Sequence, residues 1–431
     1  MRALYDLALL LVAPFLPLRL WWRGRREPGY RRHVGERFGR YASPLAASDA
    51  PLVWVHAVSL GETRAAYPLV RALEERFPRH RLLVTQMTAT GREAAENLYG
   101  DRALIAFLPY DFPWAVRRFL ARFRPRVGIV METEVWPNLL RECRRAGVPV
   151  LLANARLSER SARGYARVAS LAREAFGDIA LVGAQAAADA ERFRALGAPR
   201  VEITGNLKFD VTLAPGLVAR GRAWRERWGP RPVLLLASSR DGEEALMLDA
   251  VARRALPAGT LLVIVPRHPQ RFDAVAALLD RRGVRYSRRS AEAALTEGTD
   301  VLLGDSLGEM TAYYSACDVA MIGGSLLPFG SQNLIEACAA GAAVLLGPST
   351  FNFAQAAELA IAAGAAMQVA DADAAIEAAR LLLEDRERRE AMAAAGLRFT
   401  AAHGGATGRT LALVERLLDG TRPDVPAVRP E

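Results

Sequence analysis

A chain of 431 residues is too long for one ordinary hydrophobic core and predicts two domains of about 200 residues each. Its 51% hydrophobic and 24% charged content is typical of a packed globular protein and argues against long disordered tracts. Three well-separated cysteines without a CxxC pair argue against a disulfide framework or a zinc site and indicate a reducing compartment. The net charge of +10 predicts an anionic partner, but no helix-turn-helix, RNP or zinc-finger pattern accompanies it, which disfavours nucleic acid.

The amino-terminal segment is strongly apolar, is interrupted by Asp6, Pro14 and Pro17, and is followed by a basic block. A cleaved signal peptide carries its basic residues before the apolar stretch, so export is not expected. The uncharged run falls short of the roughly 20 residues that span a bilayer, so a helix lying in the cytoplasmic leaflet is at least as good an interpretation as a span. Trp21 and Trp22 would then lie at the headgroups. A buried core helix is the alternative.

Apolar runs of strand length alternate with amphipathic helical stretches, which indicates parallel α/β sheets. In the first half the predicted strands are 51–57, 81–85, 127–131 and 148–153, with helices at 63–76 and 113–123. The same alternation of strands and helices resumes in the second half, with predicted strands at 232–238, 260–266, 319–323 and 343–347. Two doubly wound domains are therefore expected. Ligands bind beyond the carboxyl ends of such strands, so we expect the active site in a cleft between the domains.

Acidic side chains follow two predicted strands of the first half. Glu62 stands at a strand-to-helix turn, where it could accept a proton from an attacking hydroxyl; its alternative role is to complement the positive end of the helix expected from Thr63. Glu132 and Glu134 directly follow the strand that ends at Met131. Neighbouring like charges disfavour double ionisation, so one of the two could hold a proton or bind a cationic group. Solvated loop acids are the alternative.

Lys208 is the only lysine among the 57 Lys and Arg residues of the chain. A compact ammonium suits a phosphate or a developing oxyanion in a tight space where a planar guanidinium does not fit. Chance retention of one lysine is the alternative.

Polar side chains also follow the predicted strands of the second half. Arg240, Arg267 and His268 could meet phosphate or ribose, and Glu309 could accept from a ribose hydroxyl or a base amino group. His268 could equally be a hydrogen-bonded wall residue. The pair Asp371 and Asp373 precedes a helical stretch and predicts a helix cap rather than a metal site.

A glycine-rich loop over residues 323–336 connects a strand end to a helix expected to begin near Gln332. Its glycines allow close approach, the amides at the helix start could donate to a phosphate, and Glu336 could reach a ribose diol. The segment matches neither a Walker loop nor a GxGxxG fingerprint, which disfavours nucleoside triphosphates and dinucleotides. A packing turn is the alternative.

Six short segments of the chain together resemble one family, the 3-deoxy-D-manno-octulosonic acid (Kdo) transferases of lipopolysaccharide synthesis. The segments are Ser59-Leu-Gly-Glu62, Met131-Glu-Thr-Glu-Val-Trp-Pro-Asn138, Ala153-Asn-Ala-Arg-Leu-Ser158, Leu207-Lys-Phe-Asp210, Pro266-Arg-His-Pro269 and Gly347-Pro-Ser-Thr-Phe-Asn-Phe353. The resemblance runs from the amino-terminal segment to about residue 415 and keeps the order and spacing of the motifs.

The resemblance implies a GT-B glycosyltransferase fold, with two Rossmann-like domains facing a cleft. Taken with the apolar amino terminus and the absence of a strand pattern over 212–230, it predicts a membrane-associated helix over 1–22, an acceptor-binding domain over 23–211, a CMP-sugar-binding domain over 212–420 and a flexible tail over 421–431. The donor would be CMP-Kdo, and the acceptor the bisphosphorylated lipid A precursor at the cytoplasmic face of the inner membrane. The transfer would invert the anomeric centre and require no metal or other cofactor.

The resemblance also assigns roles to residues. Glu62 would be the proton acceptor, and Glu134 and Lys208 would stabilise the transition state. CMP would contact Arg267, His268, Leu307, Gly308, Glu309, Asn333, Leu334, Ile335 and Glu336. The chain departs from the family where many members carry Gly-Gly-His-Asn-Pro in place of Gly330-Ser-Gln-Asn-Leu334, and a histidine in place of Ser349. A sugar-nucleotide epimerase on the same fold and a non-catalytic glycolipid-binding protein are the alternative functions.

Overall fold

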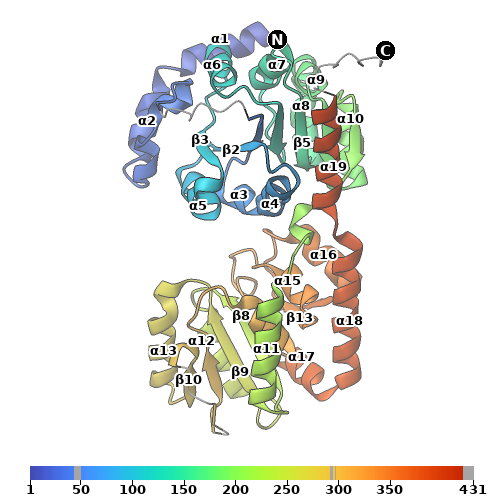
Figure 1. The fold of residues 1–431 in the computed structure, drawn as a ribbon. Coiled ribbons are helices and arrows are strands. Elements are labelled where there is room, and N and C mark those ends of the chain that lie inside the picture. Colours follow the sequence, from blue (N-terminus) through green and yellow to red (C-terminus); the bar gives the residue numbers. More distant parts are fainter. Residues whose placement is uncertain (43–49, 292–294, 297, 421–431) are drawn as a thin grey trace, which may run out of the picture. The chain divides into compact units, whose positions relative to one another are not determined.

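The computed structural model describes residues 1–42, 50–291, 295–296 and 298–420 (Figure 1). The described chain forms two compact units. The first comprises Met1–Asp210 together with the segment that begins at Gly404, and the second comprises Val211–His403. The predicted tail, 421–431, lies outside the described residues.

The first unit is built on a parallel sheet with the strand order β3-β2-β1-β4-β5-β6-β7 in the described residues. Its strands are β1 (Leu52–His56), β2 (Arg81–Gln86), β3 (Leu104–Phe107), β4 (Val127–Met131), β5 (Val150–Ala155), β6 (Leu181–Ala184) and β7 (Val201–Ile203). The order reverses between β1 and β4. In doubly wound sheets the crevice at such a reversal, outside the carboxyl ends of the strands, is where ligands bind.

Helices cover both faces of this sheet (Figure 1). They are α3 (Leu60–Ala65), α4 (Tyr67–Arg76), α5 (Ala89–Tyr99), α6 (Pro113–Phe123), α7 (Pro137–Arg145), α8 (Glu159–Ala166), α9 (Ala169–Gly177) and α10 (Ala187–Ala195), with 3₁₀ turns η1 (Pro28–Arg31), η2 (Val34–Phe38), η3 (Gly100–Arg102) and η4 (Leu207–Phe209). In β1, Trp54 packs into one core, while Val53 and Val55 pack into the core on the other face. Burial on both faces explains why the strands read as continuous apolar runs.

The last described helix, α19 (Ala406–Asp419), belongs to the first unit, which corrects the predicted boundary of the second domain at residue 420. Leu413 and Val414 of α19 join the core that contains Val53 and Val55. The carboxylate of Asp210 accepts hydrogen bonds from the backbone N–H groups at the start of α19. An amphipathic pattern shows that a helix needs an apolar surface but does not say which sheet supplies it, so the sequence placed α19 in the wrong unit.

The second unit is built on a parallel sheet with the order β10-β11-β9-β8-β12-β13-β14 in the described residues. Its strands are β8 (Val233–Ser239), β9 (Leu261–Pro266), β10 (Tyr286–Arg288), β11 (Val301–Leu303), β12 (Val319–Ile322), β13 (Ala343–Leu346) and β14 (Ala366–Gln368). Its helices are α11 (Pro215–Trp228), α12 (Glu243–Arg253), α13 (Phe272–Arg281), α14 (Met310–Ala316), α15 (Leu334–Ala339), α16 (Ala354–Ala362), α17 (Ala372–Glu384) and α18 (Arg386–His403), with 3₁₀ turns η5 (Pro269–Arg271) and η6 (Arg289–Ala291). The reversal lies between β8 and β12.

The amino-terminal segment forms two helices, α1 (Arg2–Val12) and α2 (Phe15–Arg23), which corrects the single helix predicted for 1–22. The helices bend by 57° at their junction, where Pro14 cannot donate a backbone hydrogen bond. Within the described part of the chain no single helix has the length and apolarity to cross a membrane, although the bent pair meets both criteria when taken together. The exposed apolar side chains of the pair are Leu4, Leu7, Leu10, Leu11, Val12, Phe15, Leu18, Trp21 and Trp22.

The polar side of α1 is bound to the first unit. The hydroxyl of Tyr5 donates to Asp111 at 2.8 Å, and Asp6 accepts from the side-chain amide of Asn138 at 2.7 Å. Arg2 donates to the carbonyl of Pro137 at 3.0 Å. These contacts turn the exposed leucines of α1 away from the protein.

Asp111 holds the start of α7 as well as α1. Its carboxylate accepts from the backbone N–H groups of Asn138 at 3.0 Å and Leu139 at 2.7 Å, a capping role that the preceding Trp136 cannot perform. Burial is the main reason that its pKa is raised to about 6.

Replacing Asp111 by Ala is expected to lower the free energy of unfolding by about 2 to 4 kcal/mol, because two backbone N–H groups and the Tyr5 hydroxyl lose their acceptor. Chemical denaturation of the full chain measures this loss. The control Tyr5→Phe removes only the α1 contact and is expected to cost about 1 kcal/mol. Equal losses in the two variants would show that Asp111 does not cap α7.

Candidate active site

Glu62 lies at the reversal point of the first sheet, in the first turn of α3. This helix begins at Leu60, not at Thr63 as predicted, because Ser59 caps it. The Ser59 hydroxyl accepts from the Glu62 backbone N–H, and the Glu62 carboxylate reaches back to accept from the Val58 N–H at 2.8 Å. This is close to a capping box, and the Ser-x-x-Glu spacing in the sequence could have revealed it. Glu62 therefore has a local structural role whatever else it does.

The pKa of Glu62 is raised to about 7. Partial burial is the main cause, and the charges of Glu132 and Glu134 add to it against the opposing hydrogen bond from Val58. A carboxylate with this pKa near neutral pH is well matched to proton transfer from a hydroxyl.

Glu132 and Glu134 approach Glu62 because β4 pairs with β1 in the sheet. Glu132 adopts a left-handed backbone conformation with φ 56°, which is uncommon for a residue other than glycine. Glu134 accepts from the indole N–H of Trp136 at 2.7 Å, and its own pKa is raised, mainly by burial. The structure thus brings together the acidic residues that the sequence placed after separate strands.

Lys208 lies in η4, which is attached to the same edge of the sheet through Asn154. The buried Asn154 side chain, at the end of β5, accepts from the backbone N–H of Leu207 at 3.0 Å. Asn206 caps the turn by accepting from the Lys208 N–H at 3.0 Å. Asn154 has φ 52°, a second left-handed conformation at this edge. Its role in holding the Lys208 turn was not predicted, since only the fold brings residues 154 and 207 together.

In the second unit, the glycine-rich loop is anchored by a buried carboxylate that sequence reasoning missed. Glu243, at the start of α12, accepts from the backbone N–H groups of Arg240 at 2.8 Å, Gly324 at 2.6 Å and Leu326 at 3.0 Å. It is completely buried. Gly323 approaches β8 so closely that a Cβ there would lie 2.5 Å from the carbonyl oxygen of Ser238. The loop is therefore fixed at the reversal between β8 and β12.

Arg267 and His268, which follow β9 and were predicted to meet a phosphate or ribose, form hydrogen bonds with other side chains of the second unit. Arg267 donates to the side-chain oxygen of Gln332 at 3.1 Å. His268 and Arg240 are linked through a ring nitrogen at 3.1 Å. Burial and the charges of Arg240 and Arg267 lower the pKa of His268, so a neutral ring accepts from the Arg240 guanidinium. His268 is thus hydrogen-bonded, as its alternative interpretation expected, and it remains next to two cationic groups.

Helix α14 lies between two of the predicted CMP-binding segments: it begins after residues 307–309, and its first turn is hydrogen-bonded to the segment 333–336. Glu309 pairs with Arg220 at 2.7 Å and with Arg289 at 3.2 Å. Although burial acts to raise the Glu309 pKa, its hydrogen bonds and these arginines outweigh burial and lower it. Glu336 accepts from the hydroxyl of Thr311, in the first turn of α14, at 2.7 Å. Glu309 therefore has cationic partners of its own, which sequence reasoning did not foresee.

The other residues predicted to contact CMP differ in whether their side chains or only their backbone groups could reach a ligand. Leu307 is 68% exposed, and Gly308 has φ 76°, which favours glycine. Asn333 caps α15, which begins at Leu334 and not near Gln332 as predicted. The side chains of Leu334 and Ile335 are fully buried, so only their backbone groups could reach a ligand.

The predicted cap before α17 is confirmed at Asp371, whose carboxylate accepts from the Ala374 backbone N–H at 2.8 Å. Asp373 pairs with Arg253 at 3.0 Å.

Comparisons with known proteins show which protein family the chain resembles. Residues 32–211 match the family model described as 3-Deoxy-D-manno-octulosonic-acid transferase (kdotransferase), and residues 282–399 match that of the glycosyl transferases group 1. The chain is 49% identical to the 3-deoxy-D-manno-octulosonic acid transferase of Bordetella pertussis over 96% of its own length and 99% of the relative's. It is 35% identical to that of Haemophilus influenzae, over 97% and 99% of the two chains.

The chain belongs to the Kdo transferase family. It is a Kdo-transferring glycosyltransferase, which favours the predicted function over the epimerase and the glycolipid-binding protein.

Solved structures agree on the fold. A UDP-GlcNAc 2-epimerase from Neisseria meningitidis matches with a TM-score of 0.56 and 15% identity, over 85% of this chain and 100% of that one. A glycosyltransferase from Rickettsia africae matches with a TM-score of 0.55 and 11% identity, over 86% and 99% of the two chains. At this identity the likeness concerns the fold alone. Together with the two parallel sheets and the glycosyltransferase family match, it assigns this Kdo transferase to the GT-B fold.

The departures of this Kdo transferase from the family pattern have structural counterparts. Ser331 stands where many members have glycine and has φ 69°, a conformation that glycine adopts without strain. Gln332 stands at the histidine position and accepts from Arg267. Ser349, which replaces another histidine, accepts from the Gly330 backbone N–H at 3.0 Å. Each replacement is accommodated within the second unit, so the loop keeps its internal support.

Proposed function

We propose that this enzyme transfers Kdo from CMP-Kdo to a hydroxyl of the phosphorylated lipid A precursor at the cytoplasmic face of the inner membrane, with inversion at the anomeric carbon. The observation that carries the catalytic part is Glu62 at the reversal point of the first sheet, with its pKa raised to about 7. The full-length similarity to curated Kdo transferases supports the donor and the class of acceptor.

In the proposed reaction the acceptor oxygen forms a bond to the anomeric carbon of Kdo, while the bond from that carbon to the phosphate oxygen breaks. The leaving CMP takes the bonding electron pair, and the acceptor proton passes to Glu62. Positive charge develops at the anomeric carbon and negative charge on the departing phosphate. We assign Glu134 to the first charge and the ammonium of Lys208 to the second, since fixed charges stabilise a transition state most effectively in a partly dehydrated site.

The second unit supplies the groups proposed for CMP. Arg267 and His268 would serve the phosphate, and the backbone amides around Asn333 at the start of α15 would donate to it. Glu336 and Glu309 would accept from the ribose or the base. The anchored glycine-rich loop supports this assignment, because a nucleotide phosphate binds best to donors that are already in place.

The reaction is tested by incubating the enzyme with CMP-Kdo and the lipid A precursor and weighing the lipid product. We expect a mass increment of one or more Kdo units together with released CMP. Release of CMP without a heavier lipid would contradict the assigned acceptor, and conversion of the donor without any lipid present would favour an epimerase.

The pH dependence of transfer tests the proposed base. Glu62 acts as a carboxylate, and burial raises its pKa from 4.5 to about 7, so kcat/KM is expected to fall below pH 7 and to level off above it. Glu132→Gln removes a charge that raises this pKa and should move the acid limb to lower pH. A limb that stays in place in this variant would argue against Glu62 as the titrating group.

We also propose that α1 and α2 lie in the membrane interface. The polar side of α1 is bound to the protein through Tyr5 and Asp6, and its leucines are exposed. The bent pair therefore presents an apolar face of the kind that interfacial helices bury among lipid headgroups.

The double variant Leu7→Glu, Leu11→Glu is expected to lower binding to phospholipid vesicles at least tenfold, because two leucines no longer enter the bilayer. Both side chains are exposed, so the fold should remain intact, as circular dichroism would show. Vesicle sedimentation measures the binding. Undiminished binding would place the membrane contact elsewhere.

A further inference from the structure

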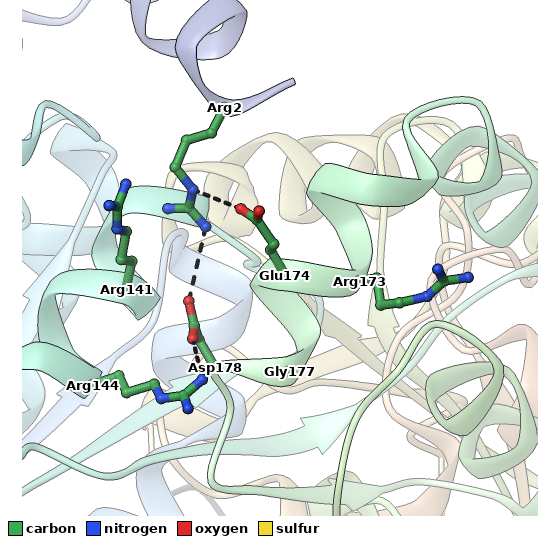
Figure 2. Close-up of a pocket in the computed structure, with 7 residues that line it drawn as sticks. All are labelled: Arg2, Arg141, Arg144, Arg173, Glu174, Gly177 and Asp178. Carbon is green, nitrogen blue, oxygen red and sulfur yellow. Dashed lines mark hydrogen bonds and ion pairs between the residues drawn. The ribbon is translucent and has the colours of Figure 1, made fainter.

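A basic pocket of about 560 Å³ lies in the first unit, beside the amino end of α1. Its lining includes Arg2 of α1, Arg141 and Arg144 of α7, Arg173 and Glu174 of α9, and Asp178, which follows α9. In Figure 2, Arg2 reaches down from α1 between Glu174 and the two arginines of α7, while Arg173 lies beyond Glu174. The proposed transfer reaction uses none of these residues.

The pocket carries more positive than negative charge. Arg2 pairs with Glu174 at 2.9 Å, and Arg144 pairs with Asp178 at 2.9 Å. Arg141 and Arg173 form no ion pair with any residue in the described ranges. With four guanidinium groups and two carboxylates, the lining has a net charge of +2. Confining like charges in one pocket is unfavourable unless an anion joins them.

The position of Arg2 connects the pocket to the apolar face of α1. Its guanidinium is fixed by the Pro137 carbonyl and by Glu174, and its side chain is only 12% exposed. The exposed leucines of α1 begin at Leu4, two residues along the same helix. An anion bound beside Arg2 would therefore lie where a lipid headgroup meets the chains that contact Leu4 and Leu7.

We propose that this pocket binds the phosphate of an anionic phospholipid. The inference rests on the proposed location of α1 in the membrane interface. Guanidinium groups match phosphate oxygens in pairs, and the volume suits a small polar headgroup. Arg141 and Arg173 supply the two charges that no carboxylate in the pocket neutralises. The competing explanation is that Arg141 only complements the negative carboxyl-terminal end of α7, as the neighbouring Arg144 and Arg145 do.

Two variants of α7 separate these explanations, because each removes one positive charge from the same helix. Arg141→Gln changes the pocket, whereas Arg145→Gln changes an exposed arginine outside it that pairs with Glu142 at 3.0 Å. On vesicles of equal amounts of phosphatidylcholine and phosphatidylglycerol, Arg141→Gln is expected to weaken binding of the full chain about fivefold. Arg145→Gln should weaken it less than twofold, and neither should change binding to phosphatidylcholine alone. Equal effects of the two variants would overturn the proposal.

A soluble probe tests the pocket even if α1 does not enter membranes. Dihexanoyl phosphatidylglycerol below its micelle concentration is expected to bind the wild-type chain saturably in calorimetry and to lose that binding in Arg141→Gln. If the chain binds this probe but binds no vesicles, the proposed location of α1 in the membrane interface would be refuted, while the proposed binding pocket would stand. Vesicle binding without any binding of the soluble probe would refute the pocket alone.

Two further experiments distinguish a phospholipid from free phosphate and from the phosphate of the lipid acceptor. Inorganic phosphate is expected not to displace the soluble lipid at equal concentration; displacement would assign the pocket to free phosphate. In detergent without phospholipid, Arg141→Gln should keep the wild-type KM for the lipid acceptor. A raised KM would assign the pocket to a phosphate of the acceptor and overturn the phospholipid assignment.

Discussion

Glu62→Gln is expected to lower kcat for Kdo transfer by about 10²- to 10⁴-fold, because the acceptor hydroxyl loses its base. The amide oxygen of the introduced side chain can still accept from the Val58 N–H, as Glu62 does at 2.8 Å, so the cap of α3 should persist. Affinity for CMP should stay close to the wild-type value. Single-turnover kinetics with CMP-Kdo and the lipid acceptor, together with calorimetric titration of CMP, measure both quantities.

Ser59→Ala is the matched structural control. It removes the hydroxyl that caps α3 but keeps the carboxylate of Glu62, and it is expected to cost about 1 kcal/mol of stability. If Glu62→Gln destabilises the protein by as much as Ser59→Ala and reduces activity no further, then Glu62 is only part of the cap.

Glu243→Gln is expected to destabilise the second unit by about 3 kcal/mol, because a charged acceptor of three backbone N–H groups is replaced by an amide. The amide nitrogen would face donors at Arg240, Gly324 or Leu326, and it cannot accept from them. The glycine-rich loop should lose its fixed conformation, so affinity for CMP is expected to fall at least tenfold. Urea unfolding and CMP titration measure the two effects.

Asp241→Asn is the control for this variant, since Asp241 lies in the same turn but is exposed and pairs with Arg271 on the surface at 3.0 Å. A change of less than about 0.5 kcal/mol is expected there. Normal CMP binding by a folded Glu243→Gln protein would show that the loop does not need this anchor.

Much of the fold could be predicted because its signals are local. The predicted strand 127–131 coincides with β4, and the predicted helix 113–123 coincides with α6. Both follow from short apolar runs and amphipathic periods that need no knowledge of partners. Boundaries were less certain where a cap decides them, as at Ser59 and Asn333.

The candidate site was predicted in part. Strand ends carry ligand-facing residues in parallel sheets, so Glu62 and Glu134 could be proposed from their positions after β1 and β4. The supports of the site could not be proposed in the same way. Glu243 lies more than eighty residues before the loop that it holds, and Asn154 more than fifty before the Lys208 turn. Such pairs leave no local pattern.

The residues alone were enough to predict the two parallel sheets, the acidic side chains that follow two strands of the first half and, through six motifs, the family to which the chain belongs. Two other features became visible only in the folded molecule: α19 covers the first sheet, and Glu132 and Glu134 help burial to raise the pKa of Glu62 to about 7. The two groups of features differ in how far apart along the chain the deciding residues lie. Strand and helix periods are properties of neighbouring residues, whereas burial, charge coupling and the anchoring of loops depend on residues that meet only after the chain has folded.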